Sequence, residues 1–224
     1  MKKNPVDILQ EIYRLYETRL ETTDIACTKY CADCCTTSVT ITRLEGLLIS
    51  QNVAKNRIAN ALFRGAHDER TRYRPAMSTN AYVEMCRTDA SPNDDPPGEQ
   101  TGTCPFLESR ACTIYPVRPF ACRCMVSTRN CAQKGYAVMD DYTLSLNTVF
   151  LQFIEHLDQN GFSGNLIDVL ACLEPEADST PDTSHLIPNR PIPVLMVPPE
   201  HRGRIAGVID SLGRLMADDQ PSES

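Results

Sequence analysis

The segment from Cys27 to Cys35, CTKYCADCC, places four thiols within nine residues. Hydrophobic burial does not require thiols, because valine or alanine would fill the same space without the risk of oxidation. The threonine, lysine and aspartate between the thiols are polar, which is untypical of a buried core. The density of thiols therefore indicates two disulfides, a redox pair or a bound metal.

The whole chain carries 11 cysteines among 224 residues, with a formal net charge of −7. The N-terminus lacks the apolar core of a signal peptide and no apolar run is long enough to cross a bilayer, so we expect a cytoplasmic protein without a membrane partner. Disulfides are rare in that compartment, where clustered cysteines more often bind metal or act in catalysis. The acidic balance argues against nucleic acid as a partner.

The hydrophobic periodicity predicts a mainly α fold, in which helices are joined by cysteine-rich and proline-rich irregular loops with a few short extended segments. Asn4 and Pro5 are typical of a helix start, and the pattern continues to about Ile25. Thr42 and Glu45 have the spacing of a capping box. Further helices are expected near residues 42–66, 81–86, 140–157, 166–172 and 200–216, with an extended piece at 38–41 and a loop at 88–102.

If the first helix ran on into the cysteine segment, Cys27, Cys31 and Cys34 would share one face, because residues at i, i+4 and i+7 lie within a narrow arc. We expect two parts: residues 1–140 as a cysteine-cluster metal-binding domain, and residues 141–224 as a helical extension packed on it. Val194–Val197, within a proline-rich stretch, is expected to be a strand or a buried extended segment.

A second group of thiols follows the proline-rich loop. Thiolates are soft ligands that favour zinc, Cu(I) or iron–sulfur clusters. Eight or more thiols in two groups suffice for two four-thiolate sites, or for one cluster and one structural ion. Adjacent Cys34 and Cys35 point in divergent directions, so each serves a different metal or one of them bridges. The thiols of this second group are Cys104, Cys112, Cys122, Cys124 and Cys131.

Two families share parts of this pattern. The spacing Cys27-x3-Cys31-x2-Cys34 is that of radical-SAM enzymes, but Asp33 stands where those enzymes carry an aromatic residue and no βα alternation follows, so we interpret this match as coincidental. The order CxxxCxxCC, CPFL, C-x-IY-x-x-RP-x-x-CR and a later cysteine resembles the YkgJ-type CxxCxxCC cysteine-cluster family. That family is described as a zinc- or iron-chelating domain and is sometimes labelled an iron–sulfur oxidoreductase.

The resemblance covers residues 27–131 and implies which thiols bind metal. The implied ligands are Cys27, Cys31, Cys34, Cys35, Cys104, Cys112, Cys122 and Cys131. Cys124 is an additional thiol whose role stays open, whereas Cys86 and Cys172 are better explained as buried free thiols. Arg118, Arg123 and Lys29 would offset thiolate charge, although Arg118 equally fits a surface cation beside a proline turn.

The resulting hypothesis is a metal-binding protein that holds zinc or an iron or iron–sulfur centre, with an electron-transfer or redox role if the metal is iron. We favour iron–sulfur slightly, because the compact C-x3-C-x2-C spacing suits a polynuclear cluster. One alternative is a zinc-stapled, non-catalytic module that docks a protein partner through Val194–Val197. Another is metal-free thiol redox catalysis. The four histidines are scattered, so no catalytic residue is assigned.

Overall fold

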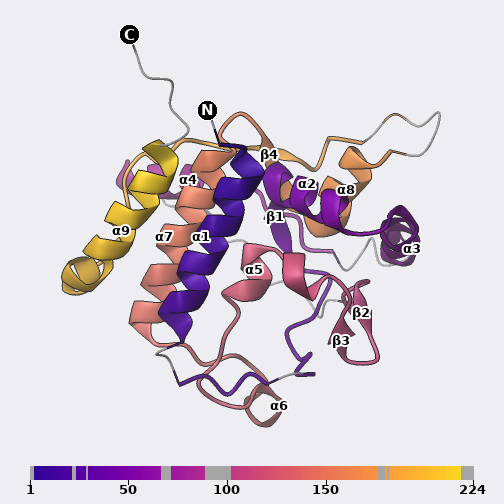
Figure 1. The fold of residues 1–224 in the computed structure, drawn as a ribbon, viewed down its shortest axis with the longest axis horizontal. Helices are drawn as coiled ribbons and strands as arrows, with labels where there is room; N and C mark the ends of the chain where they lie inside the picture. Colours follow the sequence, from indigo (N-terminus) through magenta and orange to yellow (C-terminus); the bar gives the residue numbers. More distant parts are fainter. Residues whose placement is uncertain are drawn as a thin grey trace.

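The computed structural model describes residues 3–21, 24–28, 30–66, 72–88, 102–175, 180 and 182–217. Its architecture is mainly α, as predicted (Figure 1). The helices are α1 (Pro5–Leu20), α2 (Arg43–Asn52), α3 (Lys55–Ala66), α4 (Thr79–Arg87), α5 (Phe120–Arg123), α6 (Cys131–Lys134), α7 (Asp141–Leu157), α8 (Leu166–Leu173) and α9 (Arg202–Ala217), with 3₁₀ turns η2 (Tyr115–Val117) and η3 (Pro199–His201).

Short strands fasten distant helices together. A three-stranded antiparallel sheet has the order β1-β4-β5, and β2 pairs with β3 in a separate hairpin. In the sheet, Ile41 of β1 lies opposite Gly164 of β4, so the region before α2 is paired with the region before α8. The strands are β1 (Thr40–Thr42), β2 (Leu107–Glu108), β3 (Ala111–Cys112), β4 (Phe162–Asn165) and β5 (Ile187–Pro188).

The predicted helix starts are confirmed. The Asn4 side chain accepts a hydrogen bond from the Val6 amide at 3.1 Å, and proline occupies the first turn of α1. At α2, the Thr42 hydroxyl accepts from the Glu45 amide while the Glu45 carboxylate accepts from the Thr42 amide, which completes the capping box. Capping patterns involve residues only a few positions apart, so they can be recognised in the sequence.

The predicted end of the first helix is wrong, because α1 ends at Leu20 rather than near Ile25. The described part of the cysteine segment is not helical, and Tyr30 has a left-handed φ of 70° that interrupts any helix. Its backbone instead forms tight turns, in which Cys31 donates to the Thr28 carbonyl and Cys35 to the Ala32 carbonyl, both at 3.0 Å. The cysteines therefore do not share a helix face.

The expected strand or buried segment at Val194–Val197 is also wrong. This stretch has no regular structure, and Val194 and Met196 are exposed. The buried Gln152 side chain of α7 forms hydrogen bonds with the backbone of this stretch. It donates to the Val194 carbonyl at 2.8 Å and accepts from the Met196 amide at 2.9 Å. A polar side chain thus forms the hydrogen bonds that a neighbouring strand would form in a sheet.

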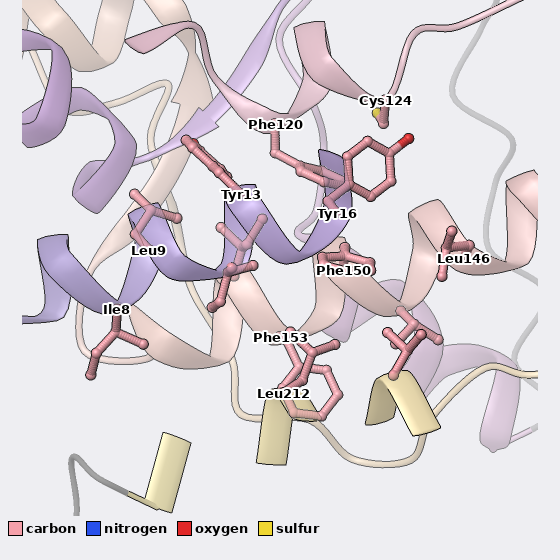
Figure 2. Packing of buried hydrophobic residues seen from close by; sticks show 14 of the residues in the cluster. Ile8, Leu9, Tyr13, Tyr16, Phe120, Cys124, Leu146, Phe150, Phe153 and Leu212 are labelled. Atoms are coloured by element: carbon pink, nitrogen blue, oxygen red, sulfur yellow. The ribbon is translucent and has the colours of Figure 1, made fainter. Parts of the chain in front are cut away.

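The largest core lies between α1, α7 and α9, which run side by side in Figure 1. Figure 2 shows its aromatic centre, where Tyr16 meets Phe120 and Phe150 edge-on at centroid distances of 4.7 and 5.0 Å. The Tyr16 hydroxyl donates to Asn147 at 2.7 Å, and Asn147 donates to the Cys124 carbonyl at 3.1 Å. Residues on both sides of position 140 build this core, and the division into two parts stays a prediction.

Glu45 joins three elements through one buried carboxylate. Besides closing the capping box, it accepts from the Tyr13 hydroxyl of α1 at 2.8 Å and from the Phe120 amide at the start of α5 at 2.7 Å. Burial raises the pKa of this carboxyl, while the four hydrogen bonds to it oppose that rise. Glu45 therefore positions α5, the short helix that carries Cys122.

Some predictions fall on residues outside the described ranges. They are most of the loop at 88–102, the polar tail after Ala217, and the side chains of Lys29 and His67. Among the helices of the described ranges, none combines the length and apolar character that a membrane span requires.

We predict that Glu45→Gln destabilises the protein by about 2 kcal/mol, because an amide group would face donors that the carboxylate now satisfies. The free energy of unfolding from urea titration measures this loss. Glu84→Gln is the control. Glu84 pairs with Arg87 on an exposed helix face, so this substitution should leave the stability nearly unchanged. Equal effects of the two substitutions would contradict the role of Glu45.

Candidate metal centre

Backbone hydrogen bonds fasten the first cysteine segment to the second cysteine region at both ends. The Ala26 amide donates to the Ser127 carbonyl at 2.7 Å, and the Cys104 amide donates to the Cys35 carbonyl at 3.0 Å. Thr36 and Thr103 form an antiparallel bridge beside the second contact. In Figure 1 the segment runs along the lower edge of the molecule, next to α6. The two thiol-bearing regions therefore converge, although a long stretch of chain separates them.

The β2–β3 hairpin brings two of the later thiols together. Leu107 pairs with Cys112, and Leu107 also donates its amide to the Cys104 carbonyl at 2.9 Å. The turn is formed by Ser109 and Arg110, both with positive φ (49° and 62°), as a two-residue hairpin loop requires.

Four thiols form what we call the inner group: Cys35, Cys104, Cys112 and Cys122. Burial raises the pKa of the Cys122 thiol well above its usual value, and the charges of Cys104 and Cys112 raise it further. Charges on Cys104, Cys122 and Cys112 also act on Cys35, where a hydrogen bond from Cys34 nevertheless lowers the pKa. Cys104 and Cys112 act on both Cys122 and Cys35, which is why we treat these four thiols as one group.

The other four thiols form the outer group: Cys27, Cys31, Cys34 and Cys131. Burial raises the pKa of the Cys27 thiol, and the charges of Cys31, Cys131 and Cys34 raise it further. Cys27, Cys31 and Cys131 line one pocket of about 180 Å³. Cys34 is exposed and donates to Cys35, so the vicinal pair lies where the two groups meet.

Amide donors and cations around the sulfurs oppose the rise in thiol pKa that burial causes. Hydrogen bonds from the Phe106 and Leu107 amides lower the pKa of Cys104, and one from Ile114 lowers that of Cys112, against the larger effect of burial in each case. The Arg118 charge also lowers the pKa of Cys112, and the buried Arg118 Nε has no hydrogen-bond partner among the described residues. The predicted proximity of Arg118 to the thiols agrees with this arrangement.

Arg123, which was also expected near sulfur, is engaged elsewhere. Its guanidinium pairs with Glu17, donates to the Arg118 and Pro116 carbonyls, and lies 4.2 Å from the centre of the Tyr13 ring. Arg123 therefore stabilises the turn between Cys112 and Cys122 instead of neutralising a thiolate.

Three cations near the thiols were missed by sequence analysis. Arg64 of α3 lowers the pKa of Cys104 by its charge, and Arg110 and Arg129 line the pocket of the outer group. Arg110 and Arg129 each stand two residues before a cysteine, and this repeated R-x-C pattern was the signal available in the sequence. Arg64 comes from a distant helix, so no local pattern indicates it.

The remaining cysteines lie apart from these groups. Cys124 is 9% exposed and packs in the aromatic core, where burial raises its pKa to about 12 (Figure 2). Cys86 and Cys172 are half-buried free thiols in α4 and α8. Within the described residues, no three cysteine, histidine, aspartate or glutamate side chains are close enough together to hold one ion as they stand. Metal binding would therefore draw the thiols of each group inward.

A mainly α chain with eight thiols gathered from distant segments is a cysteine-cluster protein. Residues 26–142, just over half of the chain, match the CxxCxxCC family model, which is described as "Putative zinc- or iron-chelating domain". The chain therefore belongs to the CxxCxxCC family, as its resemblance suggested. No curated protein and no solved structure matches the chain significantly.

Two arginine substitutions test the electrostatics in metal-free protein. Arg118→Ala should raise the pKa of Cys112, and Arg64→Ala should raise that of Cys104, because each removes a nearby positive charge. At pH 8 a higher pKa means less thiolate, so the affected cysteine should react more slowly with iodoacetamide. Peptide mass spectrometry measures each rate, and each variant is the control for the other. Slowing of the wrong cysteine would contradict the arrangement.

Proposed function

We propose that the chain chelates zinc or iron through its two groups of four thiolates. The observation that carries this proposal is the convergence of both cysteine regions, which the Ala26–Ser127 and Cys104–Cys35 backbone hydrogen bonds maintain. Four thiolates complete a tetrahedral zinc or iron site, and each group supplies four sulfurs. The family description, a zinc- or iron-chelating domain, supports the same chemistry.

The surroundings of the sulfurs fit such a role. Amide hydrogens directed at Cys104 and Cys112, together with the Arg118 and Arg64 charges, favour the deprotonated thiolates that metals require. Hydrogen bonds of this kind also orient ligands and tune the electronic properties of a centre. The Ser127 amide has the same effect on Cys27, so both groups have at least one such donor.

We further propose that the two groups differ in role. The inner group includes the half-buried Cys122, whose pKa burial raises, and joins α5 to the hairpin, which suits a structural centre. The outer group has the compact spacing of Cys27, Cys31 and Cys34 and lies beside a pocket with Arg110 and Arg129, which suits an iron–sulfur centre that meets a redox partner. Such a centre supplies one-electron chemistry when bound.

The alternative of a zinc-stapled docking module has less support. It relied on a strand at Val194–Val197 as the contact with the partner. In the structure, the Gln152 side chain instead forms hydrogen bonds with the Val194 carbonyl and the Met196 amide. A cytoplasmic location, which would keep the thiols reduced, stays a prediction.

Metal content measured on anaerobically purified protein tests the proposal. We expect Cys122→Ser and Cys131→Ser each to lose about half of the bound metal, because each removes one ligand from a different group. Cys172→Ser, a half-buried cysteine outside both groups, should retain the wild-type amount. Iron, zinc and labile sulfide are quantified on the same samples, and visible absorption separates an iron–sulfur centre from colourless zinc.

Two results would contradict the proposal. One is wild-type protein that is folded but free of bound metal. The other is an equal loss of metal in all three variants, which would place the ligands elsewhere. If absorption and labile sulfide are lost in Cys122→Ser but kept in Cys131→Ser, the assignment of roles to the two groups is reversed.

Removing the metal should also lower the melting temperature, since the binding free energy of a structural site contributes to folding. Differential scanning calorimetry with and without a chelator measures the shift. We expect the shift to be abolished in a variant that lacks both Cys122 and Cys131. A chelator effect that persists in this double variant would mean that it acts through other residues.

A further inference from the structure

A second, larger cavity lies against α5, the short helix that carries Cys122 of the inner thiol group. Its volume is about 500 Å³, and its walls come from β1, α4, α5 and α7, with Met196 at one side. Ala121 and Cys124 line it, whereas Cys122 between them belongs to the inner group. The volume falls within the range of small-molecule binding sites.

The lining of the cavity is mainly apolar. Ile41 of β1, Val83 of α4, and Leu151 and Ile154 of α7 form its walls, so three separate parts of the chain contribute. At its edge Met125 and Met196 are 42% and 37% exposed. Methionine is flexible and polarisable, which suits the entrance of a site that accommodates an apolar ligand.

The charges around the cavity exclude an anion. Its described lining contains two carboxylates, Glu45 and Glu155, and no lysine, arginine or histidine. Both carboxylates are already engaged: Glu45 accepts from Tyr13, Thr42 and Phe120, and Glu155 accepts from the Asn80 and Arg190 amides at 2.7 Å. A cation would therefore find no free carboxylate partner, so the lining favours an uncharged molecule.

One polar group of the cavity lining lacks a hydrogen-bond partner within the described residues. The Ser38 side-chain oxygen is buried and has no hydrogen-bond partner among the described residues. Buried polar groups are almost always hydrogen-bonded, so an orphaned hydroxyl at a cavity wall indicates a partner that the chain itself does not supply.

We propose that this cavity binds a small, uncharged and mainly apolar molecule that exchanges a hydrogen bond with Ser38. The site is distinct from both thiol groups, and its existence does not rest on the metal proposal. Because Ala121 of α5 lines the cavity and the next residue is Cys122, the bound molecule would lie against the helix that carries one of the inner thiols.

Two fluorescent probes that differ by one charge test the proposal on the full chain as purified. N-phenyl-1-naphthylamine is uncharged, and 8-anilino-1-naphthalenesulfonate has the same aromatic body with an added sulfonate. We expect the neutral dye to saturate at about one molecule per chain, and the anion to bind at least about tenfold more weakly. Equal binding of both dyes, or no saturable binding of the neutral one, would overturn the proposal.

Matched tryptophan substitutions locate the dye. Thr148 and Thr18 are helix threonines whose hydroxyls donate to the carbonyl four residues earlier, both at 3.0 Å, but Thr148 lines the cavity and Thr18 does not. Thr148→Trp should abolish neutral-dye binding, and Thr18→Trp should leave it unchanged. Met196→Trp, with Val194→Trp as its control, gives a second test should Thr148→Trp fail to fold. Binding retained by folded Thr148→Trp and Met196→Trp would place the dye elsewhere and overturn the assignment.

Ser38→Ala tests the hydrogen bond. Displacement of the neutral dye gives the affinities of 1-naphthol and naphthalene, which differ by one hydroxyl. We expect the preference for 1-naphthol to fall about fivefold in the variant, because its hydroxyl loses a buried partner. An unchanged preference would show that Ser38 is not the polar contact.

Discussion

The buried carboxylate of Glu45 is the interaction on which the arrangement of the thiols depends. It closes the N-terminus of α2, receives the Tyr13 hydroxyl of α1, and receives the Phe120 amide where α5 begins. Burying a charged group costs free energy unless its oxygens are fully hydrogen-bonded, and here all of these donors converge on them. One side chain thereby couples the helical core to the short helix that presents Cys122.

The parts of the fold that the sequence predicted well are those with local causes. The Asn4 cap and the Thr42–Glu45 capping box are complete within a few residues. The failures have distant causes. The Gln152 side chain forms hydrogen bonds with the backbone of the expected strand at Val194–Val197, although it lies more than forty residues earlier in the chain. The Ala26–Ser127 hydrogen bond fixes the path of the chain soon after α1 ends.

The same distinction holds for the site. Cysteine spacing and family resemblance singled out eight thiols. The structure joins the two segments that carry them through backbone hydrogen bonds, while the binding of metal by these thiols stays a proposal. The division into inner and outer groups was beyond sequence reasoning, because Cys35 is influenced by Cys104, Cys112 and Cys122, whereas the adjacent Cys34 acts on both Cys27 and Cys122. The cation Arg64 was equally hidden, since α3 approaches Cys104 only through folding.

The bridge between Thr36 and Thr103, with the Thr37 amide donating to the Gly102 carbonyl at 2.8 Å, sets the point at which the chain rejoins the thiol region. These contacts hold the residues just before Cys104 against the residues just after Cys35, so the position of Cys104 is set by its immediate neighbours. The entropy of closing a loop grows slowly with its length. A change in the number of residues before Gly102 should therefore cost little free energy and leave the sulfur atom of Cys104 in place.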